Sequence, residues 1–208
     1  MDAPEQPQIY LITPAEIDLN SFSQSLASVL DTHDIACVRL ALSTKDEDRL
    51  SRAADALREV AHARDVALVI ADHLILAERL GLDGVHLSDA ARSVRHARKE
   101  LGEDAIVGAH CGPSKHDGMV AGEAGADYVS FGPVQAHALG DGSFAPADLF
   151  QWWSEVIEVP VVAEGTLDTA TIAALSPYTD FFGIGDEIWD NEAPAQALAE
   201  LKAAMIWG

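Results

Sequence analysis

The sequence predicts an α/β fold, and within that class a (β/α)8 barrel of the TIM type. Two observations predict it: short apolar runs alternate with longer amphipathic stretches, and eight such runs occur in 208 residues. Strands covered on both faces read as nearly unbroken apolar runs, and their alternation with helices indicates a parallel sheet. Eight repeats in about 200 residues fit a compact barrel. An open, doubly wound sheet is the alternative.

Each predicted strand is a run of four to six mostly apolar residues. In chain order the runs are Ile9–Ile12, Ile35–Leu40, Ala67–Ile70, Gly84–Leu87, Ala105–Ala109, Tyr128–Phe131, Val159–Ala163 and Phe181–Ile184. Most are rich in β-branched or aromatic residues, which favour strands.

Helices are predicted between these runs, where apolar residues recur at helical spacing. They are Lys45–Arg64, Asp72–Leu80, Ala91–Leu101, Lys115–Ala124, Pro146–Ile157, Thr169–Leu175 and Pro194–Met205. Residues typical of helix boundaries lie where these helices start or stop, namely the N-cap candidates Ser114 and Asp168, the first-turn prolines Pro146 and Pro194, and the terminal glycines Gly81, Gly102 and Gly125.

The composition narrows the function classes. The chain carries 34 acidic and 13 basic residues, a formal net charge of −21. A field of this sign repels nucleic-acid phosphates and anionic membranes, so neither is expected as a partner. No stretch reaches the roughly 20 apolar residues that span a bilayer, and the acidic start does not resemble a secretory signal. We therefore expect one cytoplasmic TIM-barrel domain over residues 1–208.

Four phrases in the sequence carry a family resemblance. They are I-Y-L-I-T at 9–13, G-V-H-L at 84–87, A-G-A-D-Y-V-S-F-G-P-V at 124–134 and P-V-V-A-E-G at 160–165. In this order and spacing, the chain from Tyr10 to Trp189 resembles the thiamine-phosphate synthase family, which includes the thiazole tautomerase branch. The phrase that ends at Val134 is the most specific of the four.

The resemblance implies a TIM barrel that joins a hydroxymethylpyrimidine pyrophosphate to a thiazole phosphate, releasing pyrophosphate with Mg²⁺. Such a reaction needs cations around the leaving pyrophosphate, because negative charge builds up there as the bond breaks. It also needs amide donors for the thiazole phosphate, commonly in the loops after strands seven and eight. A phosphorylated or heteroaromatic small molecule is the expected ligand. A homodimer is expected only by analogy with similar barrels.

The resemblance also implies a Mg²⁺ site after the third and fourth strands. The family's Asn-Asp pair falls on Ala71 and Asp72, so Asp72 is the first expected ligand. The family's second acidic ligand falls on Ala91, and Asp89, two residues before it, is the expected substitute.

Substrate contacts are expected on the second strand and in the later loops. The family's Gln-x-Arg-x-Lys pattern falls on Arg39, Ala41 and Ser43, and Arg39 is expected to contact the pyrophosphate. The remaining family positions fall on His110, Cys111 and Gly112 after strand five, His137 and Gly140 after strand six, Gly165 and Thr166 after strand seven, and Asp186 after strand eight. The amides of Gly165 and Gly185 are expected to hold the thiazole phosphate, beside His110, His137 and Asp186. The chain is thus expected to be a divergent member in which several site residues are replaced.

Two alternatives stay open because phosphate-binding residues are replaced. One is a non-catalytic relative that binds a small ligand or a regulatory partner. The other is a metal-dependent hydrolase that uses Asp72, His110, His137 and Asp186, since converging histidines and carboxylates bind divalent metals. His86 is expected to be a core histidine.

Overall fold

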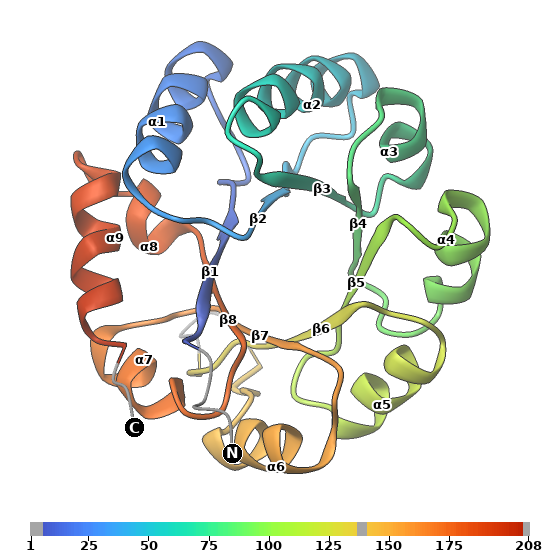
Figure 1. The fold of residues 1–208 in the computed structure, drawn as a ribbon, viewed down its shortest axis with the longest axis vertical. Coiled ribbons are helices and arrows are strands. Elements are labelled where there is room, and N and C mark those ends of the chain that lie inside the picture. The colour runs from blue at the N-terminus through green and yellow to red at the C-terminus, as the bar shows by residue number, and fades with distance from the viewer. Residues whose placement is uncertain (1–5, 137–140, 206–208) are drawn as a thin grey trace.

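The computed structural model describes residues 6–136 and 141–205, and these form a closed barrel of eight parallel strands surrounded by helices (Figure 1). The strands pair in sequence order, and β1 closes the barrel on β8. This confirms the predicted TIM barrel and excludes the open sheet. The strands are β1 (Gln8–Ile12), β2 (Cys37–Leu40), β3 (Ala67–Ala71), β4 (Gly84–Leu87), β5 (Ile106–His110), β6 (Tyr128–Phe131), β7 (Val161–Glu164) and β8 (Phe181–Ile184).

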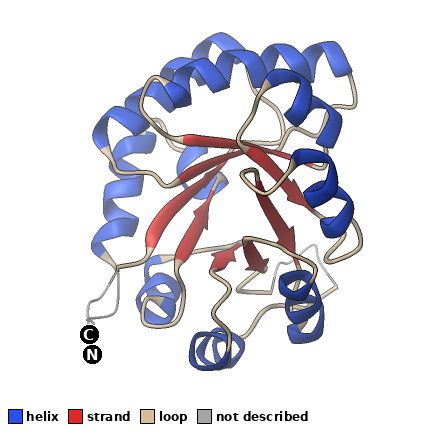
Figure 2. Ribbon diagram, turned by 45° about the vertical axis from the view of Figure 1, so that its right-hand side comes forward, coloured by secondary structure: helices blue, strands red, loops and turns tan. Residues whose placement is uncertain are grey.

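The helices form a layer outside the sheet, as the oblique view in Figure 2 shows. They are α1 (Leu19–Thr32), α2 (Glu47–His62), α3 (Leu74–Leu80), α4 (Val94–Leu101), α5 (Lys115–Glu123), α6 (Ala147–Val156), α7 (Thr169–Leu175), α8 (Asp186–Trp189) and α9 (Pro194–Ala203). Among the described residues, no helix is both long and apolar enough to cross a membrane.

Alternation along the strands divides the apolar side chains between two cores. In β1, Ile9 and Leu11 belong to the large core between sheet and helices, whereas Tyr10 belongs to a smaller cluster with Cys37, Val69, Tyr128 and Val162. Successive side chains of a strand point to opposite faces, so this second set fills the inside of the barrel. The barrel interior is therefore packed rather than open.

Several helix boundaries follow the sequence signals. The Ser114 hydroxyl accepts the Asp117 amide and the Asp168 carboxylate accepts the Thr171 amide, which confirms both predicted N-caps. Gly81 is the left-handed C-cap of α3 at φ 62°. Pro146 lies one residue before α6, as its N-cap, rather than inside the first turn.

Two helices were not predicted. Helix α1 buries Phe22, Leu26, Val29 and Leu30 on one stripe, a spacing that the sequence contains among several serines. Its N-cap Asp18 accepts the Ser21 amide. Helix α8 has four residues, too few for periodicity to reveal.

Candidate active site

An ion pair spans the barrel interior near the C-terminal ends of the strands. Arg39 is the third residue of β2 and Glu164 is the last residue of β7. The guanidinium donates from Nη1 to Glu164 Oε2 at 3.0 Å and from Nη2 to Oε1 at 3.2 Å. The two side chains are only 8% and 13% exposed. Glu164 therefore points inward, a direction that the sequence left open.

This pairing decides the charge state of both groups. Burial alone would raise the pKa of Glu164, but the positive charge and the hydrogen bonds of Arg39 lower that pKa to about 2. Burial works against the Arg39 cation in the same way, and the Glu164 carboxylate outweighs it, so the pKa of Arg39 is raised. Each charge thus stays ionised because the other is beside it.

A chain of hydrogen bonds continues from Arg39 into the barrel. Arg39 Nη1 lies 2.5 Å from His86 Nε2, His86 Nδ1 lies 2.9 Å from the Tyr128 hydroxyl, and that hydroxyl lies 2.6 Å from the Tyr10 hydroxyl. A guanidinium has only donors, so His86 Nε2 accepts and Nδ1 carries the proton toward Tyr128. Burial, and then the charge of Arg39, lower the pKa of His86 well below its usual range. His86 is the neutral core histidine that the sequence predicted.

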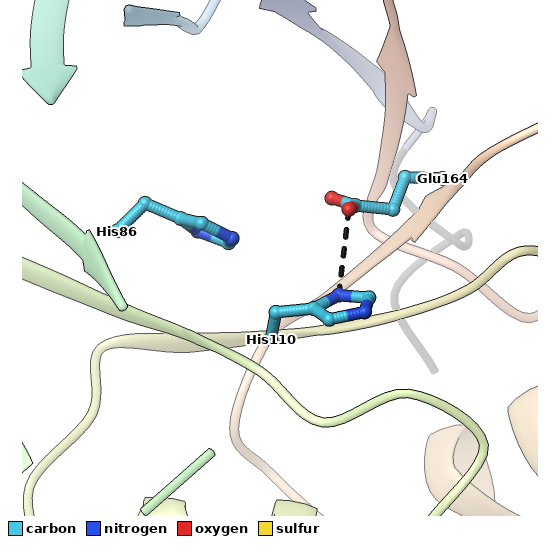
Figure 3. Close-up of side chains that lie close together, drawn as sticks. All are labelled: His86, His110 and Glu164. Carbon is cyan, nitrogen blue, oxygen red and sulfur yellow. Dashed lines mark ion pairs between the residues drawn. The ribbon is translucent and has the colours of Figure 1, made fainter. Parts of the chain in front are cut away.

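His110 lies at the end of β5, next to this series of hydrogen-bonded side chains. Its Nδ1 is 2.8 Å from the Ser130 hydroxyl and 3.4 Å from Glu164 Oε1 (Figure 3). Its side chain is 31% exposed, and it lines a surface pocket of about 670 Å³ together with Asp89. His110 is thus a polar group of the interior layer that also faces the mouth of the barrel.

His86, His110 and Glu164 have the composition of a metal site. One ligand atom from each lies within 4.8 Å of the others, and Figure 3 shows the three side chains pointing toward one another. However, Arg39 already contacts His86 Nε2 and both oxygens of Glu164, so a metal ion would have to displace this cation. Within residues 6–136 and 141–205, Asp72, His110 and Asp186 do not form such a group together, and His137 lies outside the described residues.

The two predicted Mg²⁺ ligands lie together at the rim between β3 and β4. Asp72 directly follows β3, and its two oxygens accept the amide and the hydroxyl of Ser88 at 2.8 and 2.7 Å. Asp89 Oδ2 accepts the Ser93 hydroxyl at 2.6 Å. Asp89 Oδ1 is buried and has no hydrogen-bond partner among the described groups. Both aspartates line one pocket of about 640 Å³.

This pair fits a hard divalent cation. Mg²⁺ binds through one or two carboxylates while keeping several waters, and a buried carboxylate oxygen without a partner is costly unless something binds it. The unpartnered oxygen belongs to Asp89, which lines the same pocket as Asp72, and it supplies such a position.

The loops after β7 and β8 hold the remaining predicted contacts. Asp186 is exposed at the start of α8. The Gly185 amide donates to the Glu187 carboxylate at 2.7 Å, so this predicted phosphate donor has a partner within the chain. Gly165 has φ 85°, and a side chain there would meet Pro133 at 2.9 Å. The geometry thus explains why glycine stands at 165.

Sequence reasoning left the direction of Glu164 open, and it missed Tyr10, Tyr128 and Glu187 as polar residues of the site. For Glu164 a signal existed: Val162 lies inside the barrel, and alternation by two places Glu164 on the same face. Tyr10 and Tyr128 looked like ordinary strand aromatics. For Glu187 no pattern was available, because its partner amides are at Gly185 and at the distant Leu167.

Comparison with known proteins agrees with this architecture. A family model described as thiamine monophosphate synthase matches residues 9–179. A thiamine-phosphate synthase from Rhodospirillum centenum is 40% identical over 202 residues, which are 95% of this chain and 97% of that protein. The chain belongs to the thiamine-phosphate synthase family.

Other members of the thiamine-phosphate synthase family extend the likeness. A thiamine-phosphate synthase from Erythrobacter litoralis is 37% identical over 205 residues, 95% of this chain and 96% of that protein. A solved structure of thiamine phosphate pyrophosphorylase from Pyrococcus furiosus has the same fold, with a TM-score of 0.81, 19% identity and 95% of each chain covered. These relatives do not support the alternative of a non-catalytic relative, which the replaced positions had left open.

Proposed function

We propose that this chain catalyses the synthase reaction, transferring a hydroxymethylpyrimidine group from its pyrophosphate to a thiazole phosphate. The observation that carries the proposal is the 40% identity to a thiamine-phosphate synthase over nearly the full length of both chains. The converging polar groups at the C-terminal ends of the strands support it, because active sites of TIM barrels lie at that end.

The bonds of the reaction limit what the protein must supply. The methylene–oxygen bond breaks and both of its electrons leave with pyrophosphate, while the lone pair of the thiazole nitrogen forms the new bond. That nitrogen carries no proton, so the transfer itself needs no general base. The protein must instead stabilise the leaving anion and hold the two rings in line.

Asp72 and Asp89 are the residues proposed to hold Mg²⁺, which when bound would neutralise charge on the leaving pyrophosphate. Arg39 is proposed to add positive charge beneath the site, and Glu164 keeps its guanidinium in one orientation. His110 is proposed to contact the substrate from the rim, since Ser130 and Glu164 fix Nδ1 and its side chain is partly exposed. Gly165, His137 and Asp186 stay proposed contacts.

The test is an assay for thiamine phosphate with both substrates, Mg²⁺ and purified protein. We expect turnover that falls by about a hundredfold or more in Asp72→Asn, the range for losing a group that stabilises the transition-state charge. The matched control is Glu103→Gln, an exposed acid in the loop that leads into β5, at the opposite end of the barrel. The absence of product from a folded sample would reject the proposal in favour of a non-catalytic, ligand-binding relative.

The proposal extends to the setting of the reaction. The chain is proposed to act in the cytoplasm on small phosphorylated ligands, without nucleic acid or a membrane. A homodimer is the proposed assembly, and light scattering on the eluting protein would measure it.

A further inference from the structure

Two serines hold the two aspartates that are proposed to bind Mg²⁺. Ser88 donates its amide to Asp72 Oδ1 at 2.8 Å and its hydroxyl to Asp72 Oδ2 at 2.7 Å. Ser93 donates its hydroxyl to Asp89 Oδ2 at 2.6 Å. All four residues line one pocket, in the segments that follow β3 and β4. Hydrogen bonds within the pocket therefore fix both carboxylates.

Ser93 does not have the usual role of a serine at its position. It is the N-cap residue of α4, where a serine oxygen normally accepts an amide of the first helical turn. Among the described amides of α4, none donates to this hydroxyl, which donates to Asp89 instead. Stabilisation of the helix thus does not explain the contact of Ser93 with the aspartate.

The hydrogen bonds determine what each carboxylate leaves for a cation. Asp89 Oδ2 is bound by Ser93, and the buried Oδ1 has no partner among the described residues, so one oxygen remains for a metal. Both oxygens of Asp72 accept bonds from one residue, Ser88, whose two donors approach the carboxylate as a pair. A chelating cation would need the same approach. Asp72 can therefore offer a remaining lone pair of one oxygen, but Ser88 opposes chelation.

Coordination by single carboxylate oxygens favours Mg²⁺ over Ca²⁺. Mg²⁺ requires octahedral geometry, keeps several waters, and binds through one or two carboxylates together with phosphate groups of a substrate. Ca²⁺ takes about six to eight oxygens, and carboxylates often supply both of theirs to it. A pair of aspartates that cannot chelate gives Ca²⁺ few protein ligands, whereas it suffices for Mg²⁺.

We propose that Ser88 and Ser93 are positioning residues that restrict Asp72 and Asp89 to single-oxygen coordination, and thereby make the site select Mg²⁺ over Ca²⁺. The inference rests on the proposed function, because this pair of aspartates is the proposed Mg²⁺ site. It concerns the choice of the ion rather than the transfer reaction. Metal binding without either substrate therefore tests it.

The test is displacement of bound Mn²⁺ by Mg²⁺ or Ca²⁺, with free Mn²⁺ measured by electron paramagnetic resonance. Asp89→Asn identifies the Mn²⁺ that is bound at this pair rather than at other acids. In the unaltered protein, we expect Mg²⁺ to displace Mn²⁺ at lower concentrations than Ca²⁺ does. In Ser93→Ala, the ratio of the two affinities should shift toward Ca²⁺ by about tenfold, in the range for losing a group that orients a metal ligand.

The other variants separate the serine hydroxyls from a general effect on the protein. Ser88→Ala should shift the ratio in the same direction by less, because the Ser88 amide still binds Asp72. Ser88→Thr and Ser93→Thr keep the hydroxyl, so they should retain the ratio of the unaltered protein. The matched control is Ser154→Ala, which removes an exposed hydroxyl that donates to a carbonyl of α6 and should leave the ratio unchanged.

An unchanged ratio in Ser93→Ala would overturn the proposal, and so would a preference of the unaltered protein for Ca²⁺. If Asp89→Asn binds Mn²⁺ as the unaltered protein does, the pair holds no metal and the proposal is rejected as well. These outcomes do not depend on turnover. Absence of thiamine phosphate from the activity assay rejects the synthase reaction alone, whereas turnover with an unchanged ion ratio rejects only the role of the serines.

Discussion

The interior layer and the rim between β3 and β4 differ in how fully their buried carboxylates are hydrogen-bonded. Inside the barrel, both oxygens of Glu164 are bound by Arg39, and the next groups, His86 and Tyr128, are bound in turn. At the rim, one buried oxygen of Asp89 has no partner among the described residues. The first arrangement is complete without a ligand, and the second is not.

The difference separates two uses of polar groups. A buried ion pair with satisfied hydrogen bonds fixes the geometry of the layer, although its net contribution to stability is small compared with the cost of breaking it. An unpartnered oxygen costs stability in the free protein and gains a partner when a cation binds. Substitutions in the interior should therefore change the free energy of unfolding. Substitutions at the rim should instead change the response of the protein to a bound cation.

The largest expected effect is that of breaking the interior pair. Glu164→Leu leaves the Arg39 charge buried without a counter-ion, and we expect a loss of about 3–5 kcal/mol in the free energy of unfolding. Urea denaturation measures it. In Arg39→Met with Glu164→Leu, no charge remains unpaired, so most of the loss should be recovered. A double variant as unstable as the single one would show that the pair does not carry the effect.

Acid should weaken the interior layer in two stages. Below about pH 6.5 the unfolded chain protonates His86, whereas the folded chain keeps it neutral because its pKa is lowered. Below pH 4.5 the unfolded chain protonates Glu164, whereas the folded chain keeps it ionised down to about 2. In both ranges the unfolded state binds more protons, so the free energy of unfolding falls as pH falls.

The variant His86→Asn isolates the first stage. Its free energy of unfolding between pH 7 and 5 should depend less on pH, by up to about 1.4 kcal/mol per pH unit, which is the contribution of one proton. Denaturation series at several pH values give the slopes. Equal slopes in both proteins would mean that His86 titrates normally in the folded chain.

A smaller loss is expected from the end of the hydrogen-bond chain. Tyr128→Phe removes the acceptor of His86 Nδ1–H and the partner of the Tyr10 hydroxyl, which should cost about 1–3 kcal/mol because buried donors are left unsatisfied. Tyr178→Phe is the control, since no hydrogen bond of its hydroxyl is found within the described residues. Similar losses in both variants would assign the effect to packing.

The smallest stability effect is expected at the rim. Asp89→Asn should change the free energy of unfolding by no more than about 0.5 kcal/mol without Mg²⁺, because Oδ1 has no partner to lose. With Mg²⁺ and pyrophosphate, the unaltered protein should gain thermal stability and the variant should gain less. A large loss without Mg²⁺ would place Asp89 among the structural groups instead.

The sequence predicted the barrel and most of its elements because each depends on local pattern. The cap at Asp168 and the strand at Tyr128–Phe131 needed only neighbouring residues. The proposed metal pair could also be predicted from the sequence, since Asp72 and Asp89 follow neighbouring strands whose ends meet at one rim.

The contacts across the barrel could not be predicted in this way. Arg39 and Glu164 lie 125 residues apart, and their meeting depends on the closure and stagger of all eight strands. The hydrogen bond from the Leu167 amide to Glu187 follows a backbone with positive φ at Thr166. A β-branched residue at that position gives no sequence signal of a left-handed backbone. Such features follow from the assembled fold rather than from any segment of it.

The guanidinium of Arg39 has a consequence for how this barrel could change. It contacts His86 and Glu164, two of three side chains whose potential ligand atoms lie within 4.8 Å of one another, and it thereby blocks metal binding by this group. Arg39→Met would leave His86, His110 and Glu164 to a divalent ion, and Zn²⁺ titration would detect binding that the unaltered protein lacks. A Lewis-acidic ion that activates water would thus be introduced by a single substitution, without rebuilding the scaffold. Replacing one member of the Arg39–Glu164 ion pair is therefore the smallest change that would give this interior a metal-binding function.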